Sequence, residues 1–141
     1  MAARFRSPAE VREVLDQVFA LMSTDPEMGP RLRAAQASQR FEFPDVELVV
    51  NLRAGRDGEA EHLHWAWTDE VDWEPRAELK MSSETANRFF QGKENVPFAL
   101  ARRRIRTGGD VSAALELVPV VKPVFERYGA LVRERYPHLI A

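Results

Sequence analysis

The most informative part of the sequence is residues 79–117, "LKMSSETANRFFQGKENVPFALARRRIRTGGDVSAALEL". It opens with alternating apolar and polar residues, which is typical of a strand with one buried face. Ser82 or the next serine then caps a short helix, which Gly92 closes. A basic segment over 102–109 predicts another strand, and Asp110 caps the helix that ends the stretch. These signals predict strand, helix, strand and helix in that order.

Two helices are expected at the N-terminal end, over residues 1–38. Ser7-Pro8-Ala9-Glu10 forms a capping box with proline at the first helical position. The first helix ends near Thr24, and a shorter one runs to about Ser38. Apolar residues at three- and four-residue spacing give the first helix one buried face, namely Val11, Val14, Leu15, Val18, Phe19 and Met22.

Between these helices and the opening stretch, the apolar residues recur with a period of two. The alternation over 41–52 predicts one strand with a solvated face. Asp57-Gly58 is a strong hairpin signal, and the return strand follows over 61–69. A third strand is expected over 75–82. One face of the return strand carries Leu63, Trp65 and Trp67, which we expect in the core rather than on a ligand.

Length and composition indicate a single domain. The chain has 141 residues, of which 45% are hydrophobic, enough for one sizeable core. A last amphipathic helix is expected over 124–135, within a C-terminal segment 124–141. Helices, strands, helix, strand and helices in this order predict an α+β fold. Its sheet should be largely antiparallel and covered by helices on one face.

Charge and cysteine content exclude several classes of function. The net charge of −2 provides no general attraction to nucleic acid or anionic membranes. The absence of cysteine excludes disulfides, thiolate nucleophiles and cysteine-ligated metals. The chain has neither the apolar run of a signal peptide nor a stretch of about 20 apolar residues. We therefore expect a cytoplasmic protein.

The motif order in residues 79–117 resembles the type 2 sterol carrier protein family. The likeness covers residues 41–125 and implies a five-stranded sheet with helices on one face and an apolar tunnel between them. It also implies binding of sterols, fatty acids, acyl-CoAs or related lipids without chemistry. The residues that carry it are Met81-Ser82, 85–91, Gly92-Lys93, Asn95, 98–101, Arg104-Ile105-Arg106 and Gly109-Asp110.

Two features depart from the family pattern. Arg103 stands where the family usually has a glycine before the basic strand, and it could close or redirect space near the cavity. The C-terminal "HLIA" is not a peroxisomal signal, so that location does not carry over.

The candidate site is a cavity lined by large apolar residues. Each could equally fill the core, which is the usual fate of such residues. Arg103 and Arg104 are possible contacts for a ligand headgroup. The predicted lining residues are Leu79, Met81, Phe89, Phe90, Phe98, Ile105, Leu115, Leu117, Val121 and Phe125.

The sequence gives weaker signals for a metal site or a phosphate-binding site. His62 and His64 lie two apart on a strand, but a cupin-like metal site needs a nearby glutamate and another strand histidine, and the only other histidine is His138. The basic run 102–106 suits a solvated edge, and at most transient contact with anionic headgroups is expected. We predict no metal, cofactor or nucleic-acid partner.

Our hypothesis from the sequence is a non-enzymatic carrier of a hydrophobic ligand. Two alternatives remain open at this point. One is an enzyme that acts on a hydrophobic metabolite in the same cavity, with a histidine or a turn carboxylate as acid or base. The other is a partner subunit with a filled core. The ligand and the oligomeric state are left open.

Overall fold

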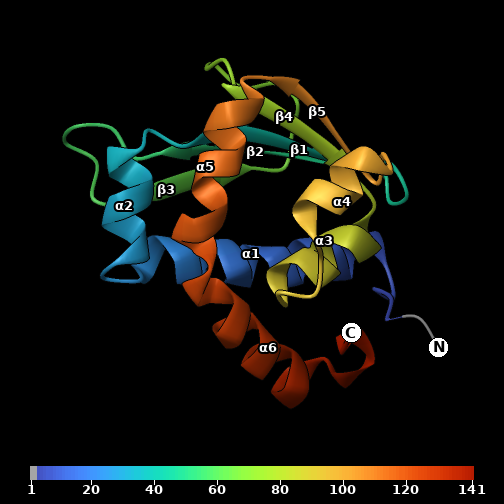
Figure 1. Ribbon diagram of the computed structural model, residues 1–141. Helices are drawn as coiled ribbons and strands as arrows, with labels where there is room; N and C mark the ends of the chain where they lie inside the picture. Colours follow the sequence, from blue (N-terminus) through green and yellow to red (C-terminus); the bar gives the residue numbers. More distant parts are fainter. Residues whose placement is uncertain (1–2) are drawn as a thin grey trace.

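The computed structural model describes residues 3–141. Its strands form one sheet in the order β3-β2-β1-β4-β5, and Figure 1 shows the helices on one side of it. No helix in the described part of the chain combines the length and apolar character needed to cross a bilayer. The elements are α1 (Pro8–Thr24), α2 (Met28–Ala34), β1 (Ser38–Phe43), β2 (Leu48–Ala54), β3 (Leu63–Ala66), β4 (Ala77–Met81), α3 (Ser83–Phe90), α4 (Val96–Ala101), β5 (Ile105–Gly109), α5 (Val111–Val121), α6 (Pro123–Arg135) and the 3-10 turn η1 (Pro137–Leu139).

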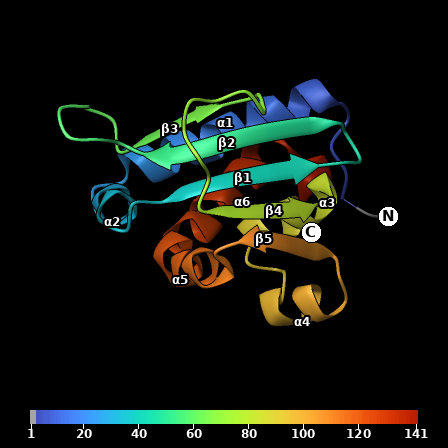
Figure 2. The same cartoon turned by 90° about the horizontal axis from the view of Figure 1, so that it is seen from above.

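Helix α1 begins at the predicted capping box. The Ser7 hydroxyl accepts a hydrogen bond from the Glu10 backbone N–H at 3.1 Å, and Pro8 occupies the first helical position. Its apolar face is buried as predicted, and the helix passes behind β2 and β3 (Figure 2). The Asp16 carboxylate accepts hydrogen bonds from the indole N–H groups of Trp65 and Trp67, at 2.9 and 2.7 Å. These two bonds fix α1 to the β3 end of the sheet.

The predicted single strand over 41–52 is wrong, because the structure has two antiparallel strands there. β1 and β2 are joined by a turn over 44–47, in which the Val46 N–H donates to the Phe43 carbonyl at 3.2 Å. Pro44 has no N–H to continue the ladder, and Glu47 has a left-handed φ of +54°. The register pairs Phe43 with Leu48, so the apolar residues of both strands stay on one face. This preserved alternation is why the sequence looked like one strand.

The sheet is mixed, with one parallel pair in the middle. β1 and β4 are parallel, whereas the other pairs are antiparallel. Figure 2 shows the connection from β3 to β4 crossing the outer face of the sheet. There the Asn51 side chain donates to the Thr68 carbonyl at 2.6 Å, and the Arg53 guanidinium lies 5.3 Å from the Trp73 ring. The connection leaves the inner face to the helices.

Residues 79–117 form the expected elements and one more. The Ser82 hydroxyl caps α3 by accepting from the Thr85 N–H at 3.0 Å, and Gly92 closes it with φ of +72°. Residues 96–101 form the short helix α4, which sequence analysis did not predict; Asn95 caps it. Helix α5 begins after the Asp110 cap and continues through Pro119.

Candidate functional site

The inner face of the sheet does not meet the helices flush, and a cavity lies between them. The empty space of this main cavity, including open solvent at its mouth, is about 900 Å³. Its wall is built by β1–β5 and α1–α5. Among the described residues, the polar side chains in the wall are Ser38, Gln39 and Thr107, and none of the lining residues is charged. The cavity is therefore suited to an apolar molecule.

Most of the predicted lining residues lie around the main cavity. Residues of β4 reach it because alternate side chains point to the inner face, and the register places Met81 opposite Ile105 of β5. A role in binding stays a prediction for all of them. The predicted residues that line the cavity are Leu79, Met81, Phe89, Phe90, Ile105, Leu115, Leu117 and Val121.

Phe98 and Phe125 do not line the main cavity, which corrects the expectation. Phe98 is 47% exposed on the outer side of α4, where the Arg102 and Arg104 guanidinium groups lie 4.9 and 5.3 Å from its ring. Because residues 96–101 are helical, Val96 and Leu100 of α4 line the cavity instead. Phe125 packs edge-on against Phe89, with ring centres 5.4 Å apart. It thus supports the wall from behind.

Sequence analysis missed the part of the wall that α1, α2 and the first three strands provide. These residues carried the right signal, since they belong to apolar helix faces or to the inner positions of strands. The signal is the same whether such a residue touches a neighbouring layer or an empty space, so it could not identify them. They include Phe19, Met22, Leu32, Phe41, Leu52 and Leu63.

The mouth of the main cavity lies between α4 and α5, beside the edge strand β5. Leu115 of α5 is 41% exposed and Thr107 of β5 is also exposed, although both line the cavity. Deeper wall residues such as Phe90 are only 4% exposed. Figure 2 shows α4 and α5 next to the β5 edge. A ligand can therefore enter between these two helices.

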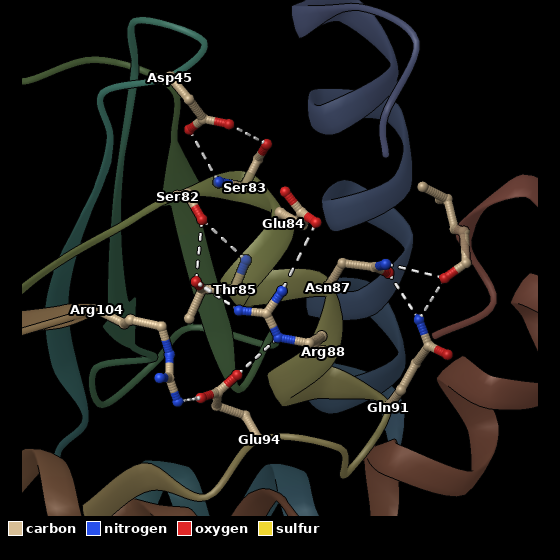
Figure 3. A network of polar contacts seen from close by, with 11 residues as sticks. Asp45, Ser82, Ser83, Glu84, Thr85, Asn87, Arg88, Gln91, Glu94 and Arg104 are labelled. Atoms are coloured by element: carbon tan, nitrogen blue, oxygen red, sulfur yellow. Dashed lines mark hydrogen bonds and ion pairs between the residues drawn. The ribbon is translucent and has the colours of Figure 1, made fainter. Parts of the chain in front are cut away.

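A buried amide holds α3, which carries Phe89 and Phe90, in place (Figure 3). Asn87 donates to the Leu139 carbonyl at 2.9 Å and accepts from the Gln91 side chain at 2.8 Å. It also accepts from the Tyr128 hydroxyl at 2.6 Å. Burial raises the pKa of Tyr128, so its hydroxyl stays a donor. The network ties α3 to α6 and to the C-terminal segment.

A second polar cluster fixes the connection between α3 and α4. The Glu94 carboxylate accepts from Arg88 at 2.8 Å and from Arg104 at 2.6 Å, and its side chain is only 3% exposed (Figure 3). Burial alone would raise the pKa of Glu94, but the hydrogen bonds from Arg104 and Arg88 outweigh it and hold the pKa below its usual value. Arg104 is therefore bound to Glu94 at the start of β5.

Arg103 and Arg104, the possible headgroup contacts, are outside the main cavity. With Lys80, Ser82 and Arg106 they line a separate open depression of about 700 Å³. Contact with a headgroup stays a prediction for both arginines.

The backbone conformation at Arg103 explains why the sterol carrier family usually has a glycine at this position. Arg103 has φ of +59°, in the left-handed region that favours glycine. Its side chain is exposed and does not line the main cavity. The expectation that Arg103 narrows the cavity is therefore not supported by the structure.

His62 and His64 have different surroundings, and only His64 lies in β3, because the strand begins at Leu63. His64 lies 3.5 Å from the Glu59 carboxylate, whereas His62 packs against Gly29 of α2 so closely that an added Cβ would lie 2.7 Å from its ring. Within residues 3–141 no group of three or more histidine, cysteine or acidic side chains could hold a metal ion.

Comparisons with known proteins concern the fold. No protein-family model and no curated protein matches the sequence. A UbiJ-SCP2 ubiquinone synthesis protein superimposes with a TM-score of 0.60 and 8% identity, over 86% of this chain and 95% of the other. Sterol carrier protein 2 from Yarrowia lipolytica, in its apo form, gives a TM-score of 0.59 and 11% identity, over 88% and 98% of the two chains.

A larger protein also contains this arrangement. A stereoselective inverting sec-alkylsulfatase from Pseudomonas sp. matches 65% of this chain with a TM-score of 0.55 and 15% identity. The match covers only 14% of the sulfatase. The five-stranded mixed sheet, its one-sided helical cover and the near-complete overlap with whole sterol carrier domains agree with the motif order of residues 79–117. The chain has the fold of the type 2 sterol carrier protein domains.

Proposed function

We propose that the protein is a non-enzymatic carrier that binds a sterol, a fatty acid, an acyl-CoA or a related lipid in the main cavity. The observation that carries this proposal is the uncharged, apolar cavity of about 900 Å³ with a mouth between α4 and α5. The likeness to sterol carrier protein 2 supports it. In this proposal residues 1–141 act as a single domain.

The magnitudes support binding without a charged anchor. Burying about 400 Å² of apolar ligand surface yields roughly 10 kcal/mol at about 25 cal/mol per Å². Association costs of at least about 4 kcal/mol leave at most roughly 6 kcal/mol, which corresponds to a Kd of about 40 μM or weaker. An exposed arginine that meets a carboxylate in water adds only about 0–1 kcal/mol. Selection among apolar ligands by chain shape should therefore be loose.

The alternatives receive less support from the geometry. An enzyme using a histidine or a turn carboxylate needs that group beside its substrate, but none of the described lining residues is titratable. A partner subunit with a filled core would leave no space between sheet and helices, whereas this core contains the main cavity.

Native mass spectrometry of gently purified protein tests the proposal. We expect a co-purified lipid, and we expect the neutral probe N-phenyl-1-naphthylamine to fluoresce when it enters the emptied cavity. Ala114→Trp, on the cavity side of α5, should fill the space and weaken probe binding at least tenfold. Ala20→Trp, on the exposed side of α1, is the matched control and should bind normally. A bare mass together with no probe uptake by the wild type would refute the carrier proposal.

A further inference from the structure

Gln39 lies where the main cavity meets a second hollow. It is near the start of β1, with Leu52 and Ala77 as register partners on the two neighbouring strands, and all three lie on the inner side of the sheet. The second hollow, about 520 Å³, opens between the α2–β1 connection and α5. Both spaces are lined by Gln39, together with Ala37, Ser38 and Leu117. A ligand in the main cavity can therefore reach the Gln39 side chain with one end.

The Gln39 carboxamide has no hydrogen-bond partner among residues 3–141. Its neighbour Ser38, in contrast, donates to the Glu74 carbonyl at 3.3 Å. Gln39 is half-buried, and its side chain offers two donors and a carbonyl acceptor. The free amide can therefore bind a hydroxyl, which donates and accepts, or a carbonyl, which accepts.

The charges around the second hollow disfavour an anionic group. Arg76 lines this hollow, but its guanidinium is already paired with the Asp110 carboxylate at 3.7 Å. Glu116 of α5 lines the hollow as well and has no ion-pair partner in the described part of the chain. Neither of these lining charges is a free cation, so an anionic head would gain no ion pair there.

We propose that the cavity selects apolar ligands with one small uncharged polar head, a hydroxyl or a carbonyl, and that Gln39 binds this head while the apolar body fills the main cavity. Gln39 is then the residue that determines which lipids are carried. This inference rests on the proposed function, because it names the class of ligand for the same cavity.

Displacement of N-phenyl-1-naphthylamine by twelve-carbon ligands with different heads tests the inference. We expect wild-type protein to bind dodecanol about fivefold more tightly than 1-chlorododecane or, at pH 8, dodecanoate; this is the factor that one net hydrogen bond provides. Gln39→Leu should remove the preference, and Gln39→Met, closer in shape, repeats the test if the leucine variant folds poorly. Gln17→Leu makes the same exchange on α1, outside the cavity, and this variant should keep the preference for dodecanol.

The outcomes separate the two proposals. If the probe binds but wild-type protein does not distinguish the heads, or prefers dodecanoate, the Gln39 inference fails while the carrier function stands. If Thr107→Val, at the mouth beside β5, removes the preference and Gln39→Leu does not, the head lies at the mouth and the inference also fails. If wild-type protein takes up neither the probe nor any of the ligands, both proposals are overturned.

Discussion

Arg103 has a left-handed φ, which is unfavourable for a residue with a side chain and costs roughly 1–2 kcal/mol. Glycine would remove this strain, but its greater freedom in the unfolded chain would offset part of the gain. We expect Arg103→Gly to raise the free energy of unfolding by about 0.5–1 kcal/mol, measured by urea denaturation. Arg102→Gly, at an ordinary φ of −88°, should lower it. Lower stability of Arg103→Gly, or a changed ligand preference, would contradict this account.

The buried Asn87 side chain hydrogen-bonds to Tyr128, Gln91 and the Leu139 carbonyl. Asn87→Ala leaves the buried Tyr128 hydroxyl without its acceptor, whereas the Leu139 carbonyl keeps its bond from the Gln91 side chain. This variant should lower the free energy of unfolding by about 2 kcal/mol. Tyr128→Phe should cost less, about 1 kcal/mol, because the Asn87 side chain keeps its bond from Gln91. Equal losses in the two variants, in urea denaturation, would show that the amide does not organise the network.

At the scale of elements, the Glu94 carboxylate joins the α3–α4 connection to β5, and its depressed pKa makes this link sensitive to acid. A carboxylate whose pKa is lower in the folded than in the unfolded protein stabilises the fold above the unfolded value, about 4.5. That contribution is lost as the pH falls from about 4.5 through the lower folded pKa.

We therefore expect Glu94→Gln to be less stable than wild type by about 1–2 kcal/mol at pH 7. The difference should shrink as the pH falls below about 4.5 and the wild-type carboxylate becomes protonated. Urea denaturation at several pH values measures both curves. Glu27→Gln, exposed before α2, is the control and should follow the wild-type curve. A difference that stays constant between pH 7 and pH 3 would count against the ion pairs with Arg88 and Arg104.

For the whole molecule, an apolar cavity inside the core couples folding to binding. A ligand present at 100 times its dissociation constant stabilises the folded state by about 2.7 kcal/mol. In a domain of this size that corresponds to a shift in Tm of roughly 10 °C. Removing co-purified lipid should lower Tm by this order, and adding ligand should restore it. Ala114→Trp should show neither change, and an unchanged wild-type Tm would indicate that the cavity holds nothing in solution.

Local signals in the sequence were sufficient for most elements. The caps at Ser7, Ser82 and Asp110 lie where the side chains predict them, because each bonds to backbone groups only a few residues away. The buried face of α1 follows from apolar spacing alone. The turn after Phe43 was missed because alternation continues on both sides of it, and α4 was missed because its 6 residues are too few to show a helical period.

The α+β class, the order of motifs in residues 79–117 and the apolar character of the layer between sheet and helices follow from the amino-acid sequence alone. The packing of distant segments was needed to show that this layer encloses a space, that Phe98 faces solvent and that Gln39 makes no hydrogen bond at one end. This difference arises because helix caps and apolar periodicity depend on neighbours in sequence. The separation between two layers depends on how many elements pack at once, and an apolar residue has the same character against a ligand as against another side chain.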